Sequence, residues 1–150
     1  MYWLTGVSAA ASLYWLTTFT TPPTVRRLES SAMVAIAMHA GPGVVARLIA
    51  FARNNQDSRV RADALFWLGQ RAGDTAAGTI SDAIDNDPDT EVKKKAVFAL
   101  SLLPKDEGVP KLIDVARNNR NAAVRKQAMF WLGQSGDSRA LTFFEDVLRK

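Results

Sequence analysis

The amino-acid sequence predicts an all-α protein, a right-handed α-α superhelix of about four 32-residue helical hairpins plus an N-terminal half-repeat. The main observation is an internal repeat. Residues 48–70 return as residues 112–134, 64 positions later, with 14 of 23 positions identical and no gap. Residues 91–103 lie halfway between the two copies and keep the same apolar positions, so the period is 32 residues. A fixed period of this length is typical of stacked supersecondary units.

This period divides the chain into a degenerate N-terminal half-repeat or cap, residues 1–27, and a repeat array over residues 28–150. Residues 2–19 carry no charged side chain, which leaves a targeting or membrane segment as an alternative. Their apolar residues keep the register of the later repeats, so we favour the cap, and the start inside a repeat indicates a piece of a longer array. The repeats are predicted at 28–59, 60–91, 92–123 and 124–150.

Each repeat is expected to begin with a helix like that over residues 60–68, where Val60, Ala64 and Leu68 recur at four-residue spacing. This spacing puts an apolar stripe on one side of a helix. An Asp or Asn stands three residues before the valine of each such helix, and its side-chain oxygen can accept from the orphan amides of the first turn. The predicted N-cap residues are Asp57, Asp89 and Asn121.

A turn marked by Gly and Asp follows, and then a second helix with its own apolar stripe. In the first repeat the stripe is Val45, Leu48 and Ala52. The next two repeats carry the equivalent residues Ala77, Ile80, Ile84, Val109, Leu112 and Ala116. Asn54, Asn86 and Asn118 form a column where these helices end, and because Asn tolerates the left-handed conformation we expect a structural role rather than ligand binding.

The pattern D-x-x-V-R-x-x-A-L-x-x-L-G followed by G-D, seen at residues 57–80, resembles the short HEAT repeats of phycobilisome-lyase-like proteins and many bacterial scaffolds. The resemblance implies a HEAT or armadillo type solenoid. In those families the first helices lie on the convex side, and the second helices line a concave surface that often binds other proteins. The first full repeat departs from the pattern, since Glu29 replaces the cation and Gly41-Pro42-Gly43 replaces the G-D turn.

Residue types that support catalysis or metal binding are scarce. His39 is the only histidine and there is no cysteine, so neither a base beside a nucleophile nor a His/Cys metal site can be assembled. No Gly-rich loop stands between a strand and a helix to hold a phosphate group. We therefore expect no catalytic residue, no metal, no cofactor and no small-molecule substrate.

Two further columns have structural interpretations. Arg61, Lys93 and Arg125 stand near the electropositive start of a helix, and we expect them to form ion pairs between repeats rather than an anion-binding stripe. The expected partners are Asp57, Asp89 and Glu91. Trp67 and Trp131 share a column with Trp3, and Ala35 and Ala99 alternate with them. That alternation predicts large and small side chains interlocking between repeats.

The candidate binding surface is the outer face of the second helices. Helical spacing directs a set of polar side chains away from the apolar stripe, and their charges alternate in sign along the array. Such alternation suits a protein or peptide partner better than a uniformly negative polymer, although a merely solvated face with local pairs is the competing interpretation. The predicted contact residues are Arg47, Arg53, Thr79, Asp82, Asp85, Lys111, Asp114 and Arg117.

We therefore predict a non-enzymatic scaffold that binds a protein or peptide through the concave face of its second helices. Two alternatives stay open. The net charge of +4 and pI near 9.7 permit a nucleic-acid-binding protein, and the family resemblance permits an accessory or lyase-like subunit of an enzyme complex. No membrane insertion is expected, and a cytoplasmic location is favoured over export.

Overall fold

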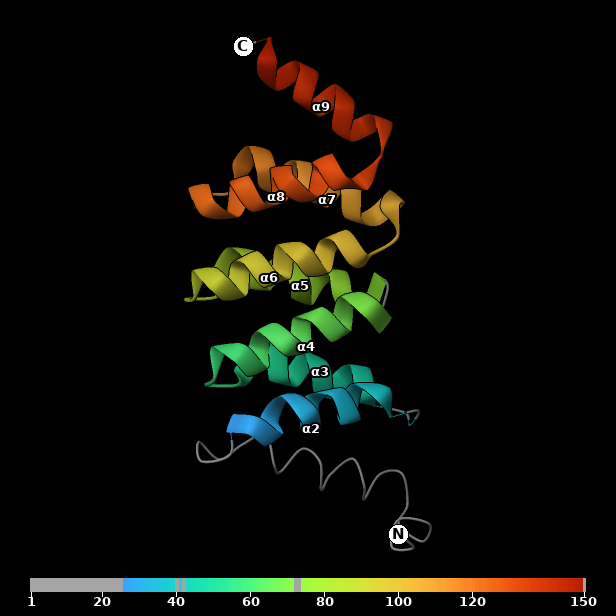
Figure 1. The fold of residues 1–150 in the computed structure, drawn as a ribbon, viewed down its shortest axis with the longest axis vertical. Coiled ribbons are helices and arrows are strands. Elements are labelled where there is room, and N and C mark those ends of the chain that lie inside the picture. The colour runs from blue at the N-terminus through green and yellow to red at the C-terminus, as the bar shows by residue number, and fades with distance from the viewer. Residues whose placement is uncertain (1–25, 40, 42, 72–73, 150) are drawn as a thin grey trace, which may run out of the picture.

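The computed structural model describes residues 26–39, 41, 43–71 and 74–149. Every regular element within these residues is an α-helix, and the helices stack along the long axis of the molecule (Figure 1). Of the predicted cap, only residues 26 and 27 belong to the described part. The helices are α2 (Arg26–Met38), α3 (Val44–Asn54), α4 (Ser58–Arg71), α5 (Asp74–Asn86), α6 (Thr90–Leu102), α7 (Lys105–Asn118), α8 (Ala122–Ser135) and α9 (Ser138–Leu148).

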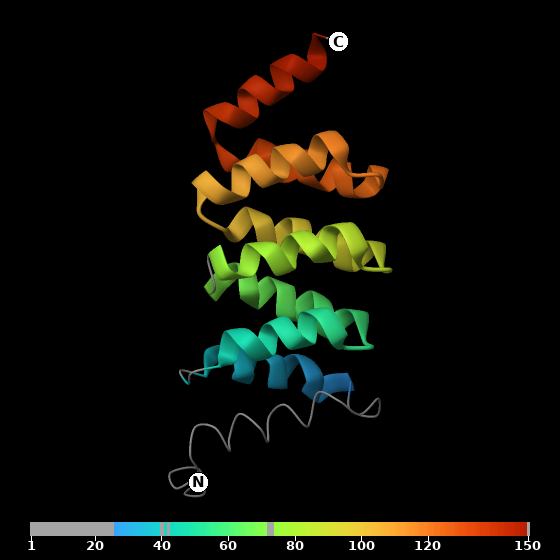
Figure 2. The ribbon, with the colours of Figure 1, turned by 180° about the vertical axis from the view of Figure 1, so that it is seen from behind.

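The stack has two layers, as a hairpin repeat requires. Figure 1 shows α4, α6 and α8 in front, and Figure 2, from behind, shows α3, α5 and α7 in front. These are the first and second helices of the predicted repeats, so the all-α solenoid is confirmed. At the C-terminal end α9 slants away from the stack. Among the described helices, none is long and apolar enough to cross a lipid bilayer.

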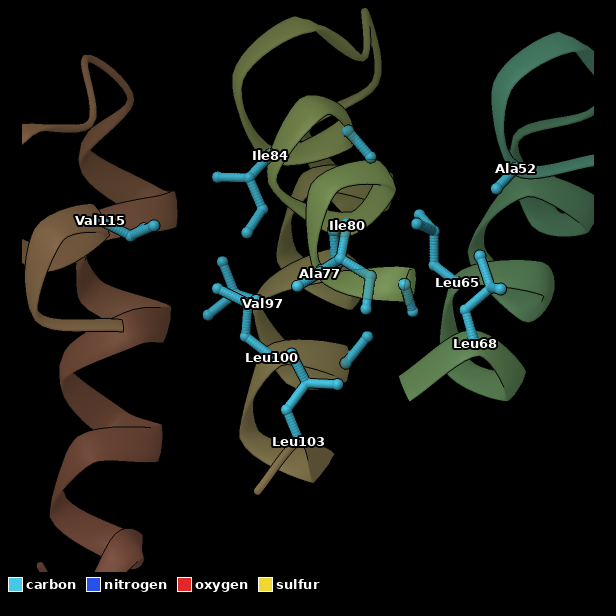
Figure 3. Packing of buried hydrophobic residues seen from close by; sticks show 14 of the residues in the cluster. Ala52, Leu65, Leu68, Ala77, Ile80, Ile84, Val97, Leu100, Leu103 and Val115 are labelled. Carbon is cyan, nitrogen blue, oxygen red and sulfur yellow. The ribbon is translucent and has the colours of Figure 1, made fainter. Parts of the chain in front are cut away.

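The apolar stripes of both layers meet in one continuous core. Figure 3 shows part of it, with Leu65 of α4, Ile80 of α5 and Val97 of α6 among the side chains that gather there. The predicted stripes are buried with one exception, since Val44 is buried in α3 while Val45 only packs against the core. Val44 lies four residues before Leu48 and eight before Ala52, so these three buried side chains share one side of α3.

Packing between repeats is more extensive than packing within them. α3 packs mainly on α4, α5 on α6 and α7 on α8, so each second helix lies chiefly against the first helix of the following repeat. The first helices also stack on one another, α4 on α6 and α6 on α8. In contrast, α9 makes only limited contacts with α7 and α8. The interfaces between neighbouring hairpins are thus larger than the interface between the two helices of one hairpin.

The predicted N-caps are confirmed. Asp57 accepts from the amide of Arg59 at 2.8 Å, Asp89 from that of Glu91 at 2.8 Å, and Asn121 from that of Ala123 at 2.9 Å. The hydrogen bond from the Glu91 amide lowers the pKa of the Asp89 carboxyl below its ordinary value, because it stabilises the charged form. Each cap satisfies one orphan donor where a first helix begins.

The connector prediction is wrong in one respect. The last residues of the second helices are Asn54, Asn86 and Asn118. None of them adopts the left-handed conformation, because within the described residues only glycines have a positive φ. The residue that follows closes the turn instead, by accepting from the amide of the next N-cap residue. These acceptors are Asn55, Asp87 and Asn119, at 2.8, 2.9 and 3.0 Å.

The side chains of the tryptophan and alanine column differ in their surroundings, since Ala99 is buried and Ala35 is exposed. Gly69 of α4 lies so close to α6 that a Cβ there would stand 2.7 Å from the carbonyl oxygen of Ala99. One repeat later Trp131 occupies the position of Ala99, and its ring packs at 4.7 Å from that of Phe98. The helix pair α4 and α6 thus approaches backbone to backbone, whereas an aromatic ring separates α6 from α8.

Gly69→Ala should destabilise the protein by about 1–3 kcal/mol, as overpacking does, because the added methyl group meets the Ala99 carbonyl. In an ordinary helix the same change stabilises by about 0.5–1 kcal/mol. Gly133→Ala is the matched control, since Gly133 lies 64 residues later in register with open space around it. Urea denaturation of both variants checks the expectation, and changes of the same sign would contradict the close approach.

Candidate protein-interaction surface

Open grooves lie between successive second helices and form a row along one side of the array. The first groove, between α3 and α5, has a volume of about 620 Å³. The second groove, between α5 and α7, and the third groove, between α7 and α9, each have a volume of about 500 Å³. They arise because second helices contact the first helices more than they contact one another.

The first groove brings together three of the predicted contact residues. Arg53 of α3 faces Asp82 of α5 across it, and both are exposed. Thr79 corrects the prediction, because it is buried, with 4% of its surface accessible, although it borders the same groove. Helical spacing alone placed it outward, but α3 packs against that side of α5. Thr79 therefore belongs to the base of the groove rather than to its exposed rim.

A buried ion pair lines the first groove. Arg61 Nε donates to Asp87 Oδ2 at 2.7 Å, and Nη2 donates to Oδ1 at 3.0 Å. The same guanidinium donates through Nη1 to the carbonyl oxygens of Asn55 and Gln56. The hydrogen bond to Asp87 raises the pKa of Arg61 above its ordinary value, against the opposing effect of burial. Arg61 thus links the end of α3 to the end of α5.

The second groove is lined by Asp85, Lys111 and Asp114, all predicted contact residues. Asn118 donates to Asp114 at 2.7 Å, and Asn86 donates to Asp82 at the same distance one repeat earlier. These amides hold the carboxylates in a fixed direction while leaving their other oxygen open. The polar side chains of the groove are therefore oriented before any partner arrives.

In the third groove Arg117 of α7 lies at 3.5 Å from Asp146 of α9, and its guanidinium lies 5.3 Å from the centre of the Phe143 ring. Sequence reasoning missed Asp146 because the last turn is one residue shorter and the helix could be aligned in two ways. The register of 32 residues would have found it, since Asp82, Asp114 and Asp146 follow one another at that interval.

The predicted residues are not all equivalent. Arg47 is half-buried on α3 and borders none of the three grooves, so the structure does not bring it together with the others. Across the described part of the chain, neither Arg53 nor Lys111 belongs to an ion pair. These two cations are thus available to an acidic group from outside.

The predicted ladder of ion pairs between repeats is mostly wrong. Lys93 donates to the carbonyl oxygen of Asp85 at 2.6 Å, and Arg125 donates to that of Asn119 at 2.8 Å. Of these three cations, only Arg61 also forms an ion pair with a carboxylate. Its partner is Asp87 rather than an N-cap residue. The cations reach back to the electronegative end of the preceding helix, where orphan carbonyl oxygens need donors. They still connect neighbouring repeats, through hydrogen bonds to the backbone.

His39 has a local structural contact. Its Nδ1 accepts from the amide of Gly41 at 3.0 Å, and its carbonyl oxygen accepts from Arg71 at 3.3 Å. Within the residues that the structure describes, no group of three His, Cys, Asp or Glu side chains is placed to hold a metal ion.

The comparison with protein families identifies the repeat. A model of HEAT repeats matches residues 45–116 and residues 78–150, which together span well over half of the chain. A search of curated proteins finds no match.

Asp87→Asn should destabilise the protein by about 3 kcal/mol, because it leaves the charge of Arg61 buried without its partner. Asparagine can still accept in the turn, as Asn55 and Asn119 do, so the loss reports the ion pair. The matched control is Asp146→Asn, whose pair with Arg117 is half-exposed, and we expect a loss of about 1 kcal/mol or less. Equal losses in the free energy of unfolding, measured by chemical denaturation, would show that the buried ion pair stabilises the protein no more than the exposed one.

Proposed function

We propose that this chain, which belongs to the HEAT-repeat family, is a non-enzymatic scaffold that binds a protein partner through its row of second helices. HEAT repeats are commonly protein-interaction scaffolds, and membership of this family supports a role in protein binding. The surface is the one that carries the three grooves. A role as accessory subunit of an enzyme complex would use the same surface and is one form of the proposal.

The observation that carries the proposal is the repetition of similar grooves at each step of the array. Each groove offers charge of both signs. Arg53 faces Asp82 in the first, Lys111 faces Asp85 in the second, and Arg117 lies beside Asp146 in the third. Charges of opposite sign within each groove would favour a partner with a matching alternation, and charge complementarity of this kind mainly sets specificity and association rate.

The spacing of the grooves favours an extended segment of the partner. Packed helices lie about 8–10 Å apart, and because the first helices α4, α6 and α8 pack on one another, each repeat advances the array by about that distance. A polyproline II segment advances about 9 Å in three residues and returns to the same face. An extended partner crossing the second helices would therefore present every third side chain to successive grooves. Basic side chains in that register would meet Asp82, Asp114 and Asp146 in turn.

Nucleic acid is the weaker candidate on the same surface. Asp82, Asp85, Asp114 and Asp146 are all exposed there and would repel a phosphate backbone. The excess positive charge of the chain does not by itself place a basic stripe along these helices.

Charge reversal tests the proposal with a matched control. The groove variant Arg53→Glu with Lys111→Glu should bind the partner about tenfold more weakly, because the acidic groups of the partner that would face these two cations are then repelled. The control Lys95→Glu with Lys126→Glu makes the same change in net charge at exposed residues of the first helices, and should bind as the natural chain does.

The measurement uses the full chain as bait in a nuclease-treated lysate, followed by titration of each purified partner. A partner that is lost with the groove variant and kept by the control is the expected result. Equal binding by both variants would place the contact elsewhere, and capture that disappears with nuclease would favour nucleic acid.

A further inference from the structure

A small pocket lies between the ends of α6 and α8 and the start of α7, and its volume is about 290 Å³. None of the residues that line it also lines one of the three grooves. Its lining includes the buried side chains of Leu103, Val109 and Leu112 and the half-buried rings of Phe98 and Trp131. The three helices all pack on one another, so the walls of the pocket are formed by contacts inside the array.

The pocket is held open because α6 lies close to α7 but apart from α8. Gly108 of α7 is so near α6 that a Cβ there would stand 2.5 Å from the carbonyl oxygen of Leu100. The ring of Trp131, in contrast, stands between α8 and α6, at 4.7 Å from the ring of Phe98. Where α4 meets α6, the same column carries Ala99, and the two backbones approach closely. The large side chain of α8 therefore keeps a space that the backbone contact closes one repeat earlier.

The lining offers hydrogen-bond donors but no carboxylate. The hydroxyl groups of Ser101 and Ser135 are already used, since each donates at 2.7 Å to the carbonyl oxygen three residues earlier. The Nε1–H of Trp131 is buried and has no acceptor among the described residues. A buried donor without an acceptor is destabilising, because nothing replaces the water that it gave up on folding. A ligand with an acceptor atom would remove that cost.

Lys105 adds a positive charge to the lining. Its side chain is exposed, and within the described residues it belongs to no ion pair. Two acids that stand near it in the chain or at the start of α9, Asp106 and Asp137, pair instead with Arg139, at 3.5 and 2.8 Å. The attraction between opposite charges is stronger beside apolar walls than in bulk water, so this ammonium group favours an anionic group at the pocket.

We propose that the pocket binds a small carboxylic acid whose apolar body packs against Phe98 and Trp131. Its carboxylate pairs with Lys105 and accepts from Trp131 Nε1–H. Because neighbouring side chains cover Nε1, a small rotation of the ring accompanies binding. The volume suits this class, since ligand pockets begin at about 300 Å³ and are mostly apolar with a few polar groups. The site is separate from the protein-binding grooves, so its failure would leave the groove proposal untouched.

The test uses the full chain, labelled with ¹⁵N, with octanoate as the probe and octanol as its uncharged match. The indole signal of Trp131 and the backbone amide signals of Lys105 and Gly108 are followed during titration. The expected result is saturable shifts with octanoate, including a downfield shift of the indole proton as it gains an acceptor. Octanol should bind about tenfold more weakly, because it lacks the charge that pairs with Lys105.

Lys105→Gln should weaken octanoate binding about tenfold and leave octanol binding unchanged. Lys126→Gln is the matched control, because it removes the same charge from α8 at an exposed residue outside the pocket, and it should bind octanoate as the natural chain does. The proposal would be overturned by the absence of saturable shifts with octanoate, or by an indole signal that does not move. Equal affinity for the two probes, or equal losses in the two variants, would also overturn it.

Discussion

The contact between each second helix and the first helix of the next repeat is the constraint on which this structure depends. A single 32-residue hairpin has two apolar stripes and too few neighbours to bury them, so its core is completed only by stacking. The larger interfaces lie across repeat boundaries, and the close approach of Gly69 to the Ala99 backbone sets the separation of α4 and α6. Cations such as Arg125 add hydrogen bonds from one repeat to the last carbonyl groups of the repeat before it.

The candidate binding surface follows from the same constraint. Because the second helices are held by the first helices rather than by one another, open grooves remain between them. Their outer side chains contribute nothing to the core and can vary in charge from repeat to repeat. Side-chain hydrogen bonds, such as that from Asn118 to Asp114, then orient the carboxylates without using all of their acceptor sites. The stacked first helices thus support a surface of second helices, and the charge pattern of that surface would determine which partner binds.

Sequence reasoning recovered what is local and periodic. The apolar stripes and the N-caps were predicted because each depends on spacing within one repeat, and both are present in the structure. It failed where the outcome depends on a neighbouring element. Thr79 is covered by an adjacent helix, which helical spacing cannot reveal. Arg61 pairs with Asp87, 26 residues away, rather than with a nearby N-cap carboxylate. Asp146 was missed because the shorter last turn left the register of α9 undecided.

The most direct test of this account is native-state hydrogen exchange of the full chain, comparing two second helices, α7 and α9. α7 packs on the following first helix, α8, whereas the described residues hold no helix after α9. Helices with few buried contacts open with a lower free energy and exchange faster. We expect the amides of α7 to be among the slowest to exchange and those of α9 to exchange much faster. Equal protection of the two helices would mean that contacts within each hairpin, rather than contacts between repeats, hold the array together.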